Sequence, residues 1–189
     1  MSVDHLERAA ASTRAVLKGI AAEDLDRDTP CASWKVRDLL NHVLGGTHVF
    51  ANTVRTGEMR PPEGGRKDFC DGDLVATFDE GAAQAVEAFA APGAAEKMLT
   101  LPFGQMPAGV FVNIAATDVF QHGWDVAKAT GQSTDLDPDL ARELLVFAQG
   151  AIPEAFRGED GTAPFGRAVE VSATAPPADQ LAGFLGRHP

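Results

Sequence analysis

The chain contains no tyrosine, only two cysteines and no long apolar run. No segment approaches the roughly 20 apolar residues that a membrane-spanning helix requires. Cys31 and Cys70 do not form a Cys-x-x-Cys pair, and neither has a histidine beside it in the sequence, so neither matches a redox or zinc-finger motif. We therefore expect two free thiols and no membrane partner.

Basic residues are also scarce, because 16 Lys and Arg stand against 27 Asp and Glu, for a formal net charge of -11. A nucleic-acid-binding surface needs a basic patch, and the basic residues here are scattered, so we expect no nucleic-acid partner. The N-terminal stretch MSVDHLERAA carries Asp4, Glu7 and Arg8 where a signal peptide would place an apolar run. These features predict a cytoplasmic protein.

The periodicity of the apolar residues predicts an all-α fold. With 189 residues the chain suits one domain, residues 1–189, which would bury roughly 70% of its unfolded surface. Helical spacing predicts helices at about 3–21, 36–56, 73–91 and 107–130, a fifth beginning near Asp137-Pro138 and a short sixth within PPADQLAGFLGRHP. We expect a main bundle at about 3–155, with a C-terminal extension at about 156–189.

Three segments lack helical periodicity. The Pro- and Gly-rich stretch GEMRPPEGGRKDFCDGD is typical of a surface loop. KMLTLPFGQMP could hold an extended piece, and FGRAVEVSATAP is predicted to be extended or irregular. These segments separate or follow the predicted helices.

The stretch DVFQHGWD (118–125) places ionisable groups on the apolar face of the fourth predicted helix. One stripe of that helix holds Phe111, Ile114, Ala115, Asp118, His122, Asp125 and Ala129, whereas Asn113, Thr117 and Lys128 lie on the other side. Because Asp118 and His122 are four residues apart, their side chains can converge on one point. Such groups form either a structural hydrogen-bonded pair or two ligands of a metal whose third ligand comes from a facing helix.

The remaining histidines offer two candidates for that third ligand. His42 and His48 both lie on the second predicted helix, six residues apart, so they point about 120° from each other and cannot both reach one ion. Each lies at a flank of the apolar stripe, and periodicity alone does not choose between them. His5 and His188 lie near the termini, where we expect them to be solvated.

Two blocks of sequence resemble a known family. TPCASWKVRDLLNHVLGG (29–46) resembles the signature P-C-x-x-W-x-V-R-D-L-L-x-H of the N-terminal domain of mycothiol-dependent maleylpyruvate isomerase, and DVFQHGWDVAKATGQ (118–132) resembles its second block. The ending FLGRHP is similar to that of a single-domain actinobacterial branch. The group belongs to the DinB/YfiT-like superfamily of metal-binding bundles, and the resemblance runs from Leu6 to Pro189.

This resemblance implies a DinB-like four-helix bundle with additional short C-terminal helices. It makes His42, Asp118 and His122 the metal ligands, for zinc or another divalent ion such as nickel, and leaves His48 without a counterpart. The isomerase has Glu where Asp118 stands, and Asp is one methylene shorter. Two imidazoles and one carboxylate leave a coordination position open, which is typical of a catalytic zinc site.

Four other residues lie within the two blocks that carry the resemblance, and each has an expected role. Asp125 shares the ligand stripe and could accept a hydrogen bond from a ligating imidazole, as supporting carboxylates do, or serve a structural role such as pairing with Arg37. Trp34 and Trp124 are expected to be packing residues, as large aromatics in a bundle usually are. Cys31 is expected to be a small buried residue.

The resemblance further implies a thiol-dependent transferase or isomerase-like enzyme that uses mycothiol and a small electrophilic substrate, as a monomer or homodimer. The isomerase has a second, C-terminal domain that completes its substrate site, and this chain ends about where that domain would begin, so we do not expect maleylpyruvate isomerisation itself. The alternatives are a non-enzymatic metal-binding or stress-related bundle, a metal-dependent hydrolase, and a bundle with a purely structural Asp-His pair.

Overall fold

The computed structural model describes residues 3–60, 67–159 and 162–189. Its α-helices are α1 (Val3–Leu17), α2 (Val36–Thr56), α3 (Leu74–Ala90), α4 (Ala108–Thr130), α5 (Pro138–Ala151) and α6 (Pro177–Phe184). Strands β1 (Met98–Leu101) and β2 (Gly104–Pro107) form an antiparallel hairpin between α3 and α4. Among the described residues no helix is both long and apolar enough to cross a membrane. The predicted all-α fold class is confirmed.

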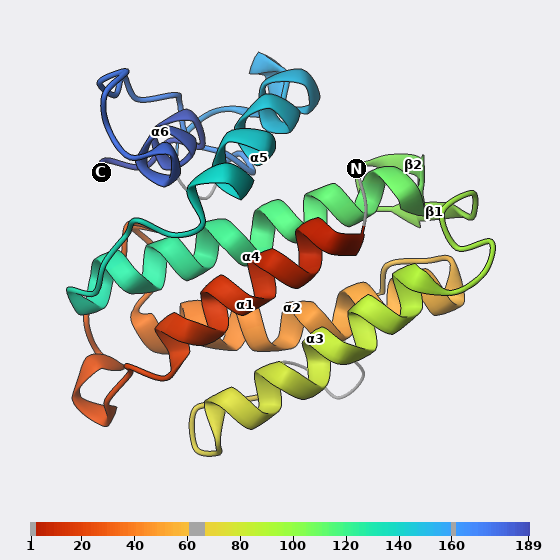
Figure 1. Ribbon diagram of the computed structural model, residues 1–189, viewed down its shortest axis with the longest axis horizontal. Helices are drawn as coiled ribbons and strands as arrows, with labels where there is room; N and C mark the ends of the chain where they lie inside the picture. The colour runs from red at the N-terminus through yellow and green to blue at the C-terminus, as the bar shows by residue number, and fades with distance from the viewer. Residues whose placement is uncertain (1–2, 61–66, 160–161) are drawn as a thin grey trace.

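Helices α1 to α4 lie side by side as a bundle, and α5 and α6 pack against each other beside α4 (Figure 1). Within the bundle, α1 contacts α3 and α4, and α2 also contacts α3 and α4. The two C-terminal helices both contact α4. A four-helix bundle with additional short C-terminal helices is therefore what the chain forms, and α4 is the helix shared by both parts.

Helix α4 is buried on nearly all sides, because the bundle covers one side and the C-terminal helices cover another. The apolar stripe predicted from the sequence is only part of this buried surface, since Asn113 and Thr117 on its other side are also buried. The Thr117 hydroxyl donates to the Asn113 carbonyl at 2.7 Å, which satisfies the hydroxyl without a solvent contact. Lys128, near the end of the helix, is exposed.

Local sequence signals account for most helix boundaries. Helix α2 has the predicted bounds. In its first turn the Asp38 carboxylate accepts a hydrogen bond from the Lys35 amide at 3.0 Å, and the helix ends before Gly57, which has a φ of 87°. Helix α4 begins at Ala108, just after Pro107, and ends before Gly131 at a φ of 72°. Helix α1 ends at Leu17, earlier than the predicted residue 21, because the chain turns before the short 3-10 helix at Ala22–Asp24.

The three non-helical segments also follow the sequence. KMLTLPFGQMP forms the β1–β2 hairpin, and residues 166–176 contain no helix or strand. The predicted loop between α2 and α3 contains neither helix nor strand in its described residues, and its positions 61–66 lie outside the described part of the chain.

The prediction that His5 is solvated is wrong. His5 is 5% exposed, and its Nε2 lies 2.7 Å from Glu143 Oε2 on α5. The next turn of α1 adds Arg8, whose guanidinium donates to Asp137 at 2.7 and 2.9 Å. The N-terminal helix is therefore tied to α5, a contact that position near a terminus does not reveal. His188 is exposed, as expected.

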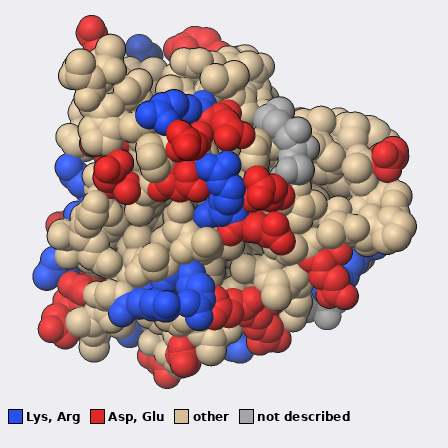
Figure 2. All heavy atoms as spheres, viewed as in Figure 1, with Lys and Arg blue, Asp and Glu red and all other residues tan. Residues whose placement is uncertain are grey.

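Charged side chains of both signs are interspersed on the surface. Figure 2 shows acidic side chains lying beside basic ones on the face seen in Figure 1. Such ion pairs include Arg14 of α1 with Asp79 of α3 at 2.7 Å, both side chains being 40% exposed. Exposed pairs contribute about 1 kcal/mol or less, so the apolar core supplies most of the stability of the bundle.

Gly123 permits a close approach between α1 and α4. A Cβ atom added at Gly123 would collide with Thr13 Oγ1 and lie 3.1 Å from Thr13 Cβ and 3.2 Å from Thr13 Cα. The Thr13 hydroxyl also donates to the Val119 carbonyl at 2.8 Å, so Thr13 is held in place. A side chain at position 123 would therefore push the two helices apart.

We predict that Gly123→Ala destabilises the protein by about 1–3 kcal/mol, the usual range for overpacking, although Gly→Ala in a helix ordinarily stabilises by up to about 1 kcal/mol. Gly150→Ala in α5 is the matched control, because a Cβ there meets nothing within 4 Å, and it should stabilise. Urea unfolding of both variants measures the two effects. Equal stabilisation by both substitutions would contradict the close approach.

Candidate metal centre

The three ligands that the family resemblance implies converge between α2 and α4. Asp118 Oδ1 lies 3.4 Å from His42 Nε2 and 3.5 Å from His122 Nε2. The two imidazole rings meet edge to face, with their centroids 4.7 Å apart. Each residue thus offers one ligand atom within 4.8 Å of the other two. Residues 76 positions apart in the sequence are brought to one point.

The spacing of these atoms fits a shared metal ion. Bonds of about 2.0–2.1 Å in a tetrahedral zinc site place the ligand atoms about 3.3–3.4 Å apart. A direct charge-assisted hydrogen bond would bring nitrogen and oxygen to about 2.7–2.9 Å. The distances from Asp118 to His42 and His122 match the first geometry. Two imidazoles and a carboxylate are also donors that a divalent transition metal accepts.

The cluster is reachable from solvent on one side. The side chains of His42 and Asp118 are 36% and 26% exposed, whereas that of His122 is 11% exposed. Trp34 borders the cluster, with its ring centroid 4.8 Å from that of His42 and 5.9 Å from that of His122. An exchangeable ligand could therefore approach past His42 and Asp118, beside a large aromatic surface.

The charges of the cluster stabilise one another. Burial raises the pKa of Asp118, but the charges and hydrogen bonds of His42 and His122 outweigh this effect and hold the pKa well below its ordinary value. Burial lowers the pKa of His122, but the opposing influence of Asp118, followed by Asp125 and Cys31, raises it well above its ordinary value. The carboxylate is therefore ionised, and a bound cation would replace the imidazole proton in balancing it.

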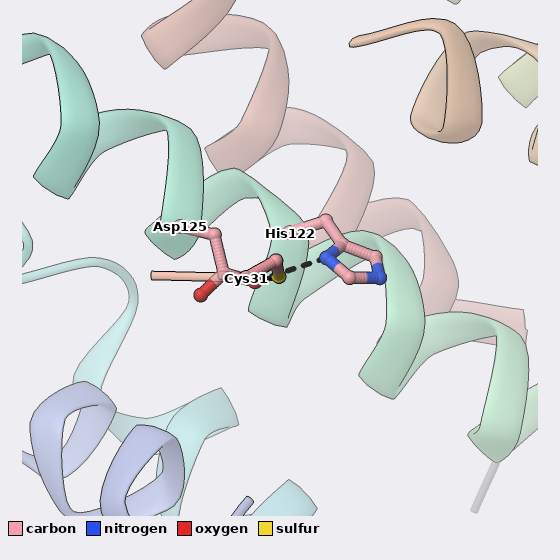
Figure 3. A group of neighbouring side chains, drawn as sticks. All are labelled: Cys31, His122 and Asp125. Carbon is pink, nitrogen blue, oxygen red and sulfur yellow. Dashed lines mark hydrogen bonds and ion pairs between the residues drawn. The ribbon is translucent and has the colours of Figure 1, made fainter. Parts of the chain in front are cut away.

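On the far side of His122 lies a second group of polar residues. His122 Nδ1 is 3.0 Å from Asp125 Oδ2, and Figure 3 shows Cys31 beside this pair. The carboxylate of Asp125 is completely buried, and it accepts hydrogen bonds from Gln121 at 3.2 Å and from the guanidinium of Arg187 at 3.2 and 3.0 Å. Burial raises the pKa of Asp125, but His122 and Arg187 together lower it to about 2.

The structure shows which groups the Asp125 carboxylate contacts. It contacts the imidazole, as the sequence allowed, and its arginine partner is Arg187 instead of Arg37. Arg37 instead donates to Asp68 at 2.6 Å in the segment before α3. Arg187 lies in the ending FLGRHP, which resembles the single-domain branch, but nothing in the sequence paired it with Asp125, 62 residues away.

A second group of possible metal ligands consists of Cys31, His122 and Asp125, whose candidate ligand atoms also lie within 4.8 Å of one another. However, Arg187 Nη2 lies 3.3 Å from Cys31 Sγ and 3.0 Å from Asp125 Oδ2. A guanidinium already placed against these atoms would repel a divalent cation. The centre formed with His42 and Asp118 is therefore the better candidate.

Among the residues around the cluster, the expectation for Cys31 needs revision, whereas both tryptophans pack as expected and His48 lies outside the cluster. Cys31 is only partly buried, and its thiol donates to Asp125 at 3.4 Å, so it is a polar contact of the cluster and not simply a filler. Trp34 packs against imidazoles, whereas Trp124 is fully buried and donates its indole N–H to Asp179 at 2.8 Å. His48 is directed elsewhere, toward Phe69 and Gln84.

Fold and site together define a helical bundle with a candidate metal centre between two of its helices. Residues 6–127 match the mycothiol maleylpyruvate isomerase N-terminal domain, and the chain belongs to this family. It is 42% identical over 181 residues to Uncharacterized protein Rv0738 and Uncharacterized protein MT0763 of Mycobacterium tuberculosis, strains H37Rv and CDC 1551. Each match covers 96% of this chain and 94% of the relative.

We predict that Asp125→Asn destabilises the metal-free protein at pH 7 by about 3–5 kcal/mol, because the buried Arg187 loses its ionised partner. The folded pKa of Asp125, about 2, lies below the unfolded value of about 3.9, so its contribution is present above about pH 4 and is lost toward pH 2. The difference in unfolding free energy between wild type and variant should therefore become smaller as the pH falls from about 4 to 2.

Chemical unfolding from pH 2 to pH 7 measures this gap. Asp139→Asn is the control, because Asp139 is 80% exposed and pairs only at the surface with Arg142. This control should change the unfolding free energy by about 1 kcal/mol or less. A pH-independent gap for Asp125→Asn would show that the charge of Asp125 does not contribute as described.

Proposed function

We propose that the protein binds a divalent metal ion, zinc in the first instance, through His42, Asp118 and His122, and that it uses this centre as a thiol-dependent transferase or isomerase-like enzyme. The observation that carries the proposal is the 3.4 and 3.5 Å spacing of Asp118 Oδ1 from the two imidazole nitrogens. Membership in the mycothiol maleylpyruvate isomerase N-terminal domain family supports mycothiol as the thiol.

The three proposed ligands together determine the charge of such a centre and the access to it. The two neutral imidazoles and one carboxylate leave a divalent ion with a net positive charge near +1 and an open position. When bound, the ion supplies Lewis-acid chemistry that lowers the pKa of a coordinated thiol toward neutral pH. The proposed ligands His42 and Asp118 lie on the exposed side, where a thiol and a small electrophile can enter.

Asp125 orients one ligand of this centre, and Trp34 shields two of its ligands from water. Asp125 accepts from His122 Nδ1, so that His122 Nε2 faces Asp118. Trp34 covers one flank of both imidazoles and reduces their contact with water. A drier flank strengthens the electrostatic interactions of the ligands.

Metal analysis of variants tests whether the proposed centre binds an ion. Wild-type protein should bind one zinc ion per chain, and His122→Ala should abolish this binding because it removes one of the three donor atoms that converge on the proposed ion. His48→Ala is the matched control, since His48 is on the same helix as His42 but contacts Gln84. Inductively coupled plasma mass spectrometry and zinc titration measure occupancy, and unchanged zinc content in His122→Ala would refute the proposed centre.

The second prediction tests the chemistry. The zinc-loaded protein should consume mycothiol together with a member of a panel of small electrophiles, and chelation should abolish the reaction. Turnover that needs the metal but no thiol would assign a hydrolase. Chelation that lowers the melting temperature, with no turnover of any substrate, would assign a structural or sensing ion instead.

A further inference from the structure

We infer that Arg187, close to the C-terminal end of the chain, is a positioning residue of the candidate metal centre that acts through Asp125 on His122. This inference rests on the proposed function for the identity of the centre. It goes further by assigning to the C-terminal segment a part in the site, although the family match ends at residue 127.

The guanidinium holds both oxygens of Asp125. Arg187 Nε donates to Oδ1 at 3.2 Å and Nη2 donates to Oδ2 at 3.0 Å, a two-point contact that fixes the plane of the carboxylate. Nη1 donates to the Leu185 carbonyl at 3.0 Å, which fixes the guanidinium in turn. The side chain of Arg187 is only 14% exposed, so water does not easily replace these contacts.

The contact continues through the imidazole to the proposed ligand atom. Asp125 Oδ2, which accepts from Arg187, is the same oxygen that lies 3.0 Å from His122 Nδ1. Fixing this oxygen fixes the rotation of the ring, and Nε2 on the opposite side is then directed toward Asp118. A metal-ligating histidine commonly takes its orientation from such an outer carboxylate.

Two contacts of the C-terminal segment place Arg187 beside Asp125. Asp179 of α6 accepts from the indole of Trp124, the residue beside Asp125. After α6, Gly186 adopts a φ of 90° and packs so closely on Gly166 that an added Cβ would lie 2.6 Å from the Gly166 Cα. This left-handed turn, which suits glycine, directs the next residue back toward α4.

A purely structural role for Arg187 is the alternative, and Arg157 provides a matched control. Arg157 is a second arginine of the C-terminal extension, with a side chain 3% exposed. Its Nη1 donates to the Phe184 and Gly166 carbonyls at 2.7 and 3.1 Å. It therefore anchors the same segment through backbone carbonyls and not through Asp125.

Zinc affinity of the full-length protein, measured by competition with a chromophoric chelator, separates the two roles. Arg187→Met should weaken zinc binding about 10- to 100-fold, the usual effect of losing an outer partner of a ligand. Arg157→Met should leave the affinity near that of wild type. Equal losses in both variants, or an unchanged affinity in Arg187→Met, would overturn the inference.

Arg187→Lys keeps the fold testable if Arg187→Met does not fold. Lysine retains the buried positive charge but lacks the planar fork that contacts both carboxylate oxygens. Its zinc affinity should fall between those of wild type and Arg187→Met, or below that of wild type if only the lysine variant folds. A wild-type affinity in Arg187→Lys would show that orientation of Asp125 by the fork is not needed.

A metal-free readout distinguishes this inference from the proposed function. The ¹⁵N chemical shift of His122 Nδ1, measured by NMR on the apoprotein, reports its hydrogen bond to Asp125. Arg187→Met should move this resonance and Arg157→Met should not. If wild type binds no zinc, the proposed function fails, whereas an unmoved resonance in Arg187→Met would sink the positioning role whatever the zinc result.

Discussion

The burial of the Asp125 carboxylate is the constraint on which the rest of the site depends. Its side chain has no solvent exposure, and an unpaired charge at such a position would cost several kcal/mol. Contacts from His122, Gln121 and Arg187 offset this cost. Because these partners come from α4 and from the segment after α6, satisfying one carboxylate also ties the C-terminal extension to the bundle and fixes the ring of His122.

His122 separates two environments of different charge. On its buried side, Asp125 and Cys31 already contact the guanidinium of Arg187. On its more exposed side, Asp118 and His42 present donors at the spacing of a metal shell. One imidazole can therefore take its orientation from the core while its other nitrogen faces the partly exposed side chains of Asp118 and His42. Of the two candidate ligand groups found among the described residues, the one with His42 and Asp118 is therefore the better placed for a cation.

The local pattern of the sequence carried much of the fold and part of the site. Helix periodicity and glycine signals placed α2 and α4 closely, and the spacing of Asp118 and His122 showed that they share a face. Periodicity did not choose between His42 and His48. The family resemblance implied His42, and the structure places His42 beside Asp118 and directs His48 toward Gln84. The expectation for His5 failed because proximity to a terminus says nothing about packing on α5.

The sequence by itself determined the helices and the order of donors along each helix, because these depend on residues three or four positions apart. Only the tertiary structure decided which distant groups meet. Cys31 and Arg187 are 156 residues apart, and both contact Asp125. Arg187 reaches this carboxylate because α6 packs on α4 and Gly186 turns the chain back. A contact of this kind arises from the packing of whole helices, so no local pattern around Arg187 reveals it.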